Sequence, residues 1–364
     1  MTGKLRAMTT ASSLLTVDLD ALAQNYTTMR SLVLPPCKVT AVVKADAYGL
    51  GIEQVAKALN AANVRTYFVA TIDEAIELRK HTDRKIATLN GFFRGAEKEY
   101  LEHDIIPVLC SLDEIDRWTY SKRCFWQVDT GMNRLGLRPH EFDKAFERAH
   151  YQPAFIMSHL ACADDPAHPK NDQQRKELAA IETRYPLMRY SLANSSGIYL
   201  GSEYHFDMVR PGMALYGLNP MPELENPMQN VVTLETRVLQ IHESQEGETA
   251  GYGATYKFER PAKLATVSLG YADGFLRAGS NQAKLYWQGQ PCPVVGRVSM
   301  DLIIVDISNL PVNIIPPYEG DFLEVIGPSQ SADALAASFG TIGYEVFTSL
   351  SRRAERIYKT SSGS

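Results

Sequence analysis

Eight short apolar runs, separated by amphipathic stretches, constrain the fold of this 364-residue chain more than any other feature. The runs cover residues 38–44, 66–70, 86–90, 105–109, 125–128, 154–158, 189–193 and 206–209. Apolar residues at helical spacing lie between them, at 52–61, 72–80, 112–118, 139–150 and 171–184. Eight strands with helical spacers predict an α/β fold of the (β/α)8 TIM-barrel type. Periodicity alone leaves an open doubly wound sheet as the alternative, but no G-x-G-x-x-G follows the first strand.

A helix is predicted immediately before the first barrel run. Residues 14–17 could form a short strand, and Asp18 is a suitable N-cap for the helix that follows. Apolar side chains recur on one face of this helix until Pro35-Pro36 ends it. The residues on that face are Leu19, Leu22, Tyr26, Met29 and Val33.

The pattern changes after residue 227. Short apolar runs at 232–242, 263–269, 293–300, 302–307 and 322–326 are separated by Gly, Pro and Asn, without long helical spacers until 331–339. This pattern indicates a mostly antiparallel β domain, and the proline-rich segment 219–227 indicates a linker. We therefore predict a barrel over 12–227 and a mostly β C-terminal domain over 228–360, on which residues 1–11 could pack.

Charge and hydropathy exclude several classes of partner. A net charge of −5 leaves no basic footprint for nucleic acid. No stretch reaches the roughly 18–20 apolar residues of a membrane span, and the N-terminus lacks an apolar signal core. The five cysteines show neither a C-x-x-C pair nor zinc-ligand spacing, so we predict no metal site. These observations together predict a cytoplasmic protein with free thiols.

The first barrel run ends in Lys44, which would lie at the C-terminal rim of the barrel, where such folds carry their chemistry. On spacing alone this lysine would be a solvated strand end. However, AVVKADAYGLG, at 41–51, resembles the cofactor-lysine signature of alanine racemases. The resemblance implies that pyridoxal 5'-phosphate binds covalently to Lys44, a task suited to a partly desolvated amine. It also implies that Tyr48 helps to bind the cofactor phosphate.

Further segments resemble motifs of the same family, and they occur along this chain in the same order as in that family. DTGMNRLG, at 129–136, implies that Arg134 holds the substrate carboxylate, and SHLACAD, at 158–164, implies that His159 packs near the cofactor's pyridine ring. One position departs from the pattern, because many relatives carry a lysine, carbamylated in some, where this chain has Gln127. Arg134 must then be oriented in another way, for which the amide carbonyl of Gln127 is one candidate.

Two segments at the ends of the last two predicted barrel strands imply the rest of the cofactor site. NSSG, at 194–197, implies that Ser195 binds the phosphate, and DMVRPGMALYG, at 207–217, implies the same of Gly212 and Met213. In the family, the arginine matching Arg210 faces the pyridine nitrogen and bonds the residue matching His159. A guanidinium donates to that nitrogen without protonating it, which favours reprotonation at the α-carbon over transamination.

Three residues of the predicted β domain complete the resemblance. LGYADGF, at 269–275, implies that Tyr271 is the second catalytic base, and GRVSMD, at 296–301, implies that the backbone of Met300 contacts the substrate carboxylate. GYE, at 343–345, implies that Tyr344 binds phosphate and narrows the entry. Tyrosine ordinarily has a pKa of about 10, so such a base needs a partner or nearby positive charge.

The resemblance implies an alanine racemase that uses pyridoxal 5'-phosphate and two bases, with Lys44 on the D-face and Tyr271 on the L-face. In the family, Tyr271 and Met300 reach the barrel of the other chain, which implies a homodimer with composite sites. Whether such an enzyme would supply D-alanine for cell-wall synthesis or degrade it stays open. The alternatives are a decarboxylase of the same fold and cofactor, a racemase of broader specificity and a non-catalytic carrier of the cofactor.

Overall fold

A computed structural model describes residues 9–361 of the chain and divides it into two compact units. The first unit covers residues 21–229. The second combines residues 9–20 with 230–361. Within residues 9–361, no helix is both long and apolar enough to span a membrane.

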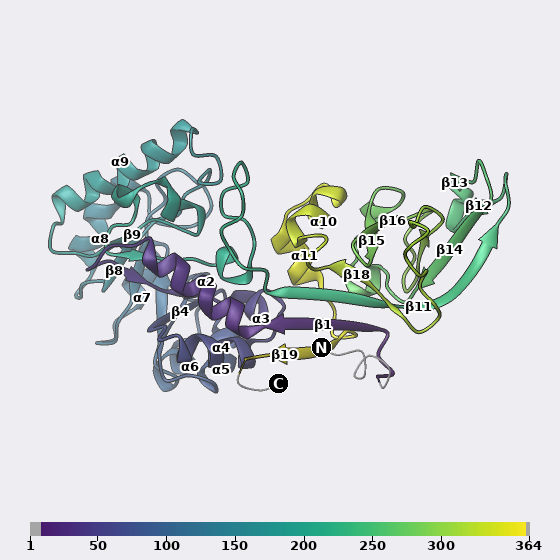
Figure 1. Ribbon diagram of the computed structural model, residues 1–364. Helices are drawn as coiled ribbons and strands as arrows, with labels where there is room; N and C mark the ends of the chain where they lie inside the picture. Colours follow the sequence, from purple (N-terminus) through teal and green to yellow (C-terminus); the bar gives the residue numbers. More distant parts are fainter. Residues whose placement is uncertain (1–8, 362–364) are drawn as a thin grey trace. The chain divides into compact units, whose positions relative to one another are not determined.

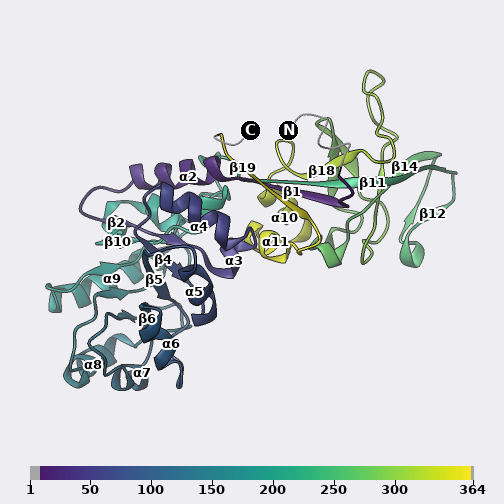
Figure 2. The ribbon, with the colours of Figure 1, turned by 90° about the horizontal axis from the view of Figure 1, so that it is seen from below.

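Parallel strands in the first unit form a ring (Figure 2). The ring is β2 (Lys38–Val39), β3 (Ala41–Val42), β4 (Thr66–Val69), β5 (Lys85–Thr88), β6 (Ile105–Leu109), β7 (Phe125–Gln127), β8 (Phe155–Met157), β9 (Tyr190–Ser191) and β10 (Met208–Val209). β2 and β3 are halves of one extended run, since β2 pairs with β10 while β3 pairs with β4. This run therefore closes the sheet on itself, and the predicted (β/α)8 barrel is confirmed.

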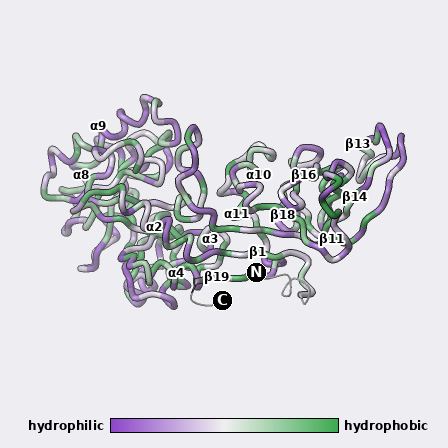
Figure 3. The backbone as a smooth tube through the Cα atoms, viewed as in Figure 1, coloured by the Kyte–Doolittle hydropathy of each residue, from purple (hydrophilic) through white to green (hydrophobic). Residues whose placement is uncertain are grey.

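The helices of this unit lie outside the strands (Figure 2). They are α2 (Leu19–Ser31), α3 (Lys44–Tyr48), α4 (Ile52–Ala61), α5 (Ile72–Arg79), α6 (Glu97–Glu102), α7 (Leu112–Arg117), α8 (Phe142–Arg148) and α9 (Pro169–Arg184), and α2 begins in the second unit. The predicted first helix is confirmed: its apolar face is buried, and Asp18 Oδ1 accepts a hydrogen bond from the amide of Asp20. Figure 3 shows α9 as hydrophilic along much of its length, yet its Leu178 and Ile181 are buried.

Aromatic side chains fill part of the barrel interior. The ring of Phe125 on β7 lies 6.0 Å from that of Phe68 on β4 and 5.4 Å from that of Phe155 on β8, between centroids. β4 and β7 are not neighbours in the sheet, so Phe68 and Phe125 meet through the interior of the ring. The barrel is therefore packed with side chains, as is usual for eight strands.

The second unit is built on a mixed sheet in the order β16-β15-β18-β11-β1-β19, with β14 and β17 continuing from β11 (Figure 1). Its strands are β1 (Ser13–Asp18), β11 (Val232–Ser244), β14 (Ala262–Val267), β15 (Lys284–Trp287), β16 (Gln290–Pro293), β17 (Ile303–Asp306), β18 (Phe322–Ile326) and β19 (Glu355–Lys359). A small separate sheet consists of β12 (Thr249–Ala250) and β13 (Tyr256–Lys257), and the helices are α10 (Ala332–Phe339) and α11 (Gly343–Ser349).

The first strand belongs to this sheet and not to the barrel unit, in which the predicted boundary at residue 12 placed it. β1 pairs antiparallel with β11 and parallel with β19, so it is held on both edges. Arg237 also donates to the backbone oxygens of Thr9 and Ala11. Residues 9–11 thus pack on the β unit, while residues 1–8 of the predicted extension lie outside the described part of the chain.

The predicted run 293–300 does not form one strand. Only its first residue, Pro293, lies in β16, which forms a hairpin with β15 around Gln288 and Gly289, both with positive φ. Beyond β16, Gly296 has a φ of +79°. The backbone oxygen of Met300 accepts a hydrogen bond from the amide of Ala272 at 3.0 Å. The segment departs from a strand because its backbone bends at this glycine and pairs with a turn.

Candidate active site

Lys44 follows β3 at the C-terminal rim of the barrel and opens a left-handed turn. Ala45, Asp46, Ala47 and Tyr48 have φ values of 55°, 54°, 56° and 56°, all in the left-handed region. For residues other than glycine this conformation costs about 1–2 kcal/mol each, so surrounding contacts must stabilise it. The sequence did not predict the left-handed sense of this turn.

Two carboxylates hold this turn in place. Glu74 Oε1 accepts a hydrogen bond from the amide of Ala45 at 2.8 Å, while its Oε2 accepts from the amide of Ala70 at 2.7 Å. Asp46 Oδ1 accepts from the amide of Ile52 at 2.7 Å, at the start of α4. Glu74 therefore ties the loop after β3 to the loop after β4 and fixes the backbone next to Lys44.

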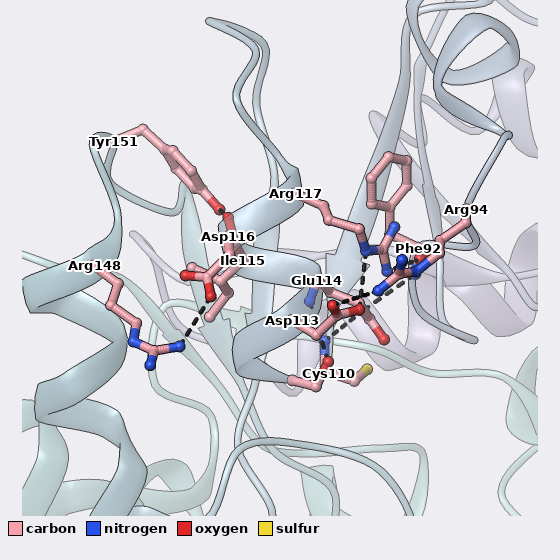
Figure 4. Close-up of polar contacts among 11 residues, drawn as sticks. Phe92, Arg94, Cys110, Asp113, Glu114, Ile115, Asp116, Arg117, Arg148 and Tyr151 are labelled. Carbon is pink, nitrogen blue, oxygen red and sulfur yellow. Dashed lines mark hydrogen bonds and ion pairs between the residues drawn. The ribbon is translucent and has the colours of Figure 1, made fainter.

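Glu114 repeats this arrangement further around the barrel. Its Oε2 accepts hydrogen bonds from the amides of Phe92 at 3.1 Å and Cys110 at 2.8 Å (Figure 4). Each glutamate is the third residue of a helix whose N-cap is Thr71 or Ser111. Sequence reasoning missed both carboxylates, although a threonine or serine followed three residues later by glutamate is the signal of a capping box.

Positive charge gathers around Lys44. Partial burial lowers the pKa of the Lys44 amine, the nearby Arg134 guanidinium lowers it further, and the Glu74 carboxylate acts in the opposite direction. A lysine with a lowered pKa carries more of the neutral amine that attacks a carbonyl. The structure thus brings Lys44 and Arg134 together at one rim, as the resemblance implies.

Arg210, at the end of β10, is buried among neutral acceptors. It donates to Ser191 Oγ and the backbone oxygen of Ser158, and its Nη2 lies 3.4 Å from Nδ1 of His159. Burial lowers the pKa of Arg210 to about 10, so its guanidinium stays protonated at neutral pH. No carboxylate within residues 9–361 forms an ion pair with it, although a buried charge is normally compensated.

His159 is a neutral imidazole in this environment. Burial, followed by the positive charges of Arg210, Arg134 and Lys44, lowers its pKa from 6.5 to about 3. Because the Arg210 guanidinium can only donate, Nδ1 of His159 is the acceptor, which assigns the ring proton to Nε2. The expected contact between His159 and Arg210 is present.

Beside these groups, the loops that follow β9 and β10 form a small cradle around the hydroxyl of Ser195. Ser195 Oγ accepts hydrogen bonds from the amides of Gly212 at 2.9 Å and Ala214 at 3.3 Å, which leaves its O–H as a donor. A Cβ at Gly212 would lie 2.4 Å from Tyr48 Oη, and the Tyr48 ring stacks on that of Tyr216 at 4.4 Å. Only glycine fits there, and the sequence-predicted Met213 directly follows it in the same turn.

These features fit pyridoxal 5'-phosphate. The cradle offers a hydroxyl donor beside a backbone that a glycine opens, which suits a phosphate group. Arg210 offers a protonated donor without a carboxylate partner, which suits a ring nitrogen that only accepts. The Lys44 amine has the lowered pKa that covalent attachment to an aldehyde requires.

The predicted bracing of Arg134 by Gln127 is not observed. The backbone oxygen of Gln127 accepts from the amide of Leu137 at 2.9 Å, but within residues 9–361 its side chain makes no hydrogen bond to Arg134. Asp129 instead shapes the loop between them, since its Oδ1 accepts from the amides of Gly131, Met132 and Asn133. The backbone of this loop is therefore held by a carboxylate and not by a carbamylated lysine.

The β unit brings Tyr271 and Met300 together on its own surface. The amide of Tyr271 donates to the backbone oxygen of Ser299 at 3.1 Å, and the amide of Ala272 donates to the backbone oxygen of Met300 at 3.0 Å. Both predicted side chains are exposed, at 44% for Tyr271 and 52% for Met300. Tyr344, the remaining sequence-predicted residue, lies in α11 of the same unit and is half-buried.

Comparison with known proteins supports both units. Family models described as "Alanine racemase, N-terminal domain" and "Alanine racemase, C-terminal domain" match residues 17–220 and 231–358. The chain is 45% identical to an alanine racemase of Rhodospirillum rubrum over 96% of both chains. It is 43% identical to a catabolic alanine racemase of Mesorhizobium japonicum, over 96% of this chain and 93% of that one.

A solved structure gives the same result for the fold. The alanine racemase of Bartonella henselae with covalently bound pyridoxal phosphate has a TM-score of 0.90 and 40% identity, and covers 96% of this chain and 100% of its own. The likeness extends over both units, so the barrel and the β unit occur together in that protein. On these grounds, the chain belongs to the alanine racemase family.

Proposed function

We propose that this protein interconverts L-alanine and D-alanine, with pyridoxal 5'-phosphate attached to Lys44 and with Tyr271 of the partner subunit as the opposite base. The observation that carries the proposal is the position of Lys44. It ends the first barrel run on a braced left-handed turn, and its pKa is lowered by burial and by Arg134. Membership in the racemase family over both units supports this reaction over the decarboxylase alternative.

Pyridoxal 5'-phosphate, when bound, supplies an aldehyde for attachment and an electron-withdrawing ring that acidifies the hydrogen on the α-carbon. The chain's own groups orient it and move the protons. Arg210 would donate to the ring nitrogen, because its pKa of about 10 keeps it charged. His159, neutral with a pKa of about 3, would pack beside the ring and accept from Arg210 without adding a further charge.

The remaining barrel residues would hold the two anionic groups. Ser195, Gly212, Met213 and Tyr48 would bind the cofactor phosphate, the first three through the hydroxyl and backbone groups of the cradle. Arg134 would bind the substrate carboxylate, since a guanidinium forms paired bonds with carboxylates. Met300 and Tyr344 would complete the carboxylate and phosphate contacts from the β unit.

Racemisation requires a proton to leave one face of the α-carbon and another to arrive at the opposite face. Lys44 would exchange the proton on the D-face and Tyr271 the proton on the L-face. The exposure of Tyr271 and Met300 supports a role at an interface, because exposed apolar side chains grouped on a surface often mark contact sites. We therefore propose a homodimer in which each site takes Lys44 from one subunit and Tyr271 from the other.

Hydrogen exchange at the α-carbon tests the assignment of the bases. In deuterium oxide, the wild-type enzyme should exchange the α-hydrogen of both enantiomers. Tyr271→Phe should retain the cofactor absorbance and exchange with D-alanine, but lose exchange with L-alanine by about 10²–10⁴-fold. Tyr318→Phe is the matched control, because this tyrosine of the same unit is 67% exposed. Unchanged exchange with L-alanine in Tyr271→Phe would refute the role of Tyr271.

Mixing two inactive variants tests the composite site. Dimers formed from Lys44→Ala and Tyr271→Phe subunits contain one intact site and one doubly defective site if each site draws on both chains. Random assortment then restores about a quarter of the wild-type activity, because half of the dimers are mixed and each has one intact site of two. If each site lay within one chain, every site would carry a defect and mixing would restore nothing.

Two further proposals concern the substrate and the location of the protein. Alanine is the proposed substrate, and a racemisation panel over other amino acids would reveal a broader enzyme. We also place the protein in the cytoplasm, which is supported by the five cysteines, none of which forms a disulfide. Pairing of these thiols in protein isolated from cells would contradict that location.

A further inference from the structure

The barrel has a second open mouth at the N-terminal ends of its strands, away from Lys44. A cavity of about 930 Å³ lies there, and its apolar lining includes Ile106, Phe125, Phe155 and Met208. Phe125 and Phe155 belong to the packed interior described above. The cavity is therefore closed at its inner end by the barrel core.

Six cationic side chains line this mouth. They are Arg30, Lys38, Arg65, Lys85, Arg123 and Arg189. Two of them are the first residues of β2 and β5, and three more lie one or two residues before β4, β7 and β9. Because parallel strands in a closed ring all begin at the same end, these charges converge although they are far apart in the sequence.

No carboxylate lines the cavity. Asp104 and Asp207 precede the neighbouring strands β6 and β10, but both are engaged elsewhere. Asp104 pairs with Lys122 at 3.2 Å, and Asp207 Oδ2 accepts from the amide of Tyr190 at 2.8 Å. Within residues 9–361, none of the six cations has an ion-pair partner.

Contacts of Lys38 and Lys85 show how the charges at this mouth are arranged. Lys38 Nζ lies over the ring of Phe155, 5.4 Å from its centroid, and is thus directed toward the barrel core. Partial burial lowers the pKa of Lys85, and the charges of Arg123, Lys38 and Arg189 lower it further. The cations are close enough to repel one another, so an anion placed among them would relieve that repulsion.

We propose that this mouth binds the oligophosphate group of a small molecule. Four of the six cations are arginines, whose planar forks pair with phosphate oxygens two at a time. A single monoanion would compensate only one of six charges, whereas a chain of linked phosphates presents several negative groups within one cavity. Phe125 and Phe155, which line the inner end of the cavity, would give a base an apolar contact if the ligand is a nucleotide.

The site is independent of the proposed racemase chemistry. None of its lining residues is among those assigned to the cofactor or to alanine, and the two mouths lie at opposite ends of the barrel strands. Binding is therefore tested on the enzyme loaded with pyridoxal 5'-phosphate, whose own phosphate occupies the cradle at Ser195. Failure of one proposal leaves the other standing.

Isothermal titration of the loaded enzyme with inorganic tripolyphosphate, and separately with a nucleoside triphosphate, is the direct test. We expect saturable binding that weakens when salt is raised to about 0.15 M, as for a contact between phosphates and exposed cations. Lys85→Gln combined with Arg123→Gln should weaken binding at least about tenfold. The control is Lys144→Gln with Lys98→Gln, two exposed lysines that do not line the mouth and that change the net charge equally.

Each outcome decides the proposal. Binding of tripolyphosphate alone, or tighter binding of the nucleotide, supports the site and identifies the source of the phosphates. Absence of binding by both probes overturns the proposal, as does equal weakening in the Lys144 and Lys98 control, which would reflect net charge. A second pair, Arg65→Gln with Arg189→Gln, must reproduce the loss, and its cofactor absorbance and racemisation rate confirm that it is folded.

Discussion

The barrel unit and the β unit present their predicted active-site residues in opposite ways. In the barrel, Arg210 is buried, and burial lowers the pKa values of Lys44 and His159. In the β unit, Tyr271 and Met300 are exposed and held mainly by backbone hydrogen bonds. The barrel therefore tunes the charge states of its groups by burying them, whereas Tyr271 and Met300 of the β unit remain open to solvent in the described chain.

The same contrast appears in chain connectivity. Each barrel strand pairs with strands close to it in the sequence, except where β2 closes the ring with β10. In the β unit, β1 pairs with β11 and β19, which follow it by more than two hundred residues. Local pairing brings the loops after successive strands to one rim, so the barrel is the part in which a site can be anticipated from the sequence.

The largest expected effect comes from adding one methyl group at a glycine in each unit. A Cβ at Gly212 would lie 2.4 Å from Tyr48 Oη, and one at Gly270 would lie 2.2 Å from the backbone oxygen of Met300. Gly212→Ala should weaken cofactor binding about 10- to 100-fold, which corresponds to roughly 1–3 kcal/mol for an overpacked site. Absorbance titration of the cofactor-free protein measures this affinity.

Gly270→Ala should behave differently. It displaces the backbone beside Tyr271, so we expect slower racemisation with unchanged affinity for the cofactor. The comparison between the units fails if Gly270→Ala weakens cofactor binding as much as Gly212→Ala does.

A smaller effect is expected from the two matched carboxylates of the barrel. Glu74→Ala leaves three backbone amides without their acceptor and Glu114→Ala leaves two. Each change should cost about 1–3 kcal/mol of unfolding free energy. Only Glu74 supports the turn next to Lys44, so only Glu74→Ala should also slow racemisation. Urea unfolding and steady-state kinetics measure the two quantities, and an equal loss of activity in both variants would contradict the specific role of Glu74.

The effect expected to be smallest, counted per pH unit, is the dependence of barrel stability on pH. The pKa of His159 is about 3 in the folded chain and ordinarily 6.5, so between these values the unfolded chain binds a proton that the folded chain does not. Stability should therefore fall as pH decreases from about 6.5 toward 3, by up to about 1.4 kcal/mol per pH unit from this residue.

His159→Gln should remove that part of the slope. Denaturant unfolding at several pH values measures it, and His242→Gln in the β unit is the control, because His242 is exposed to solvent. An unchanged slope in His159→Gln would show that His159 is not held neutral by its surroundings.

Much of the barrel was predictable because its information is local. The apolar runs with helical spacers identified every barrel strand to within a few residues, and Asp18 identified the start of α2. The segments around Lys44 and Arg210 lie at the rim where the strand order places them. The run 293–300 was predicted wrongly, because a bend at Gly296 and pairing with the turn at Ala272 replaced the strand.

The sequence by itself determined the family, the alternation of strands and helices in the barrel and the residues available for chemistry, since these follow from short periodic patterns and contiguous motifs. The tertiary structure alone decided the pairing of β1, the left-handed turn after Lys44 and the ring of cations at the opposite mouth. The physical reason is that pairing, strain and charge depend on distances between residues far apart in the chain. Burial acts in the same way, because the pKa of Lys44 or His159 depends on neighbours that only folding supplies.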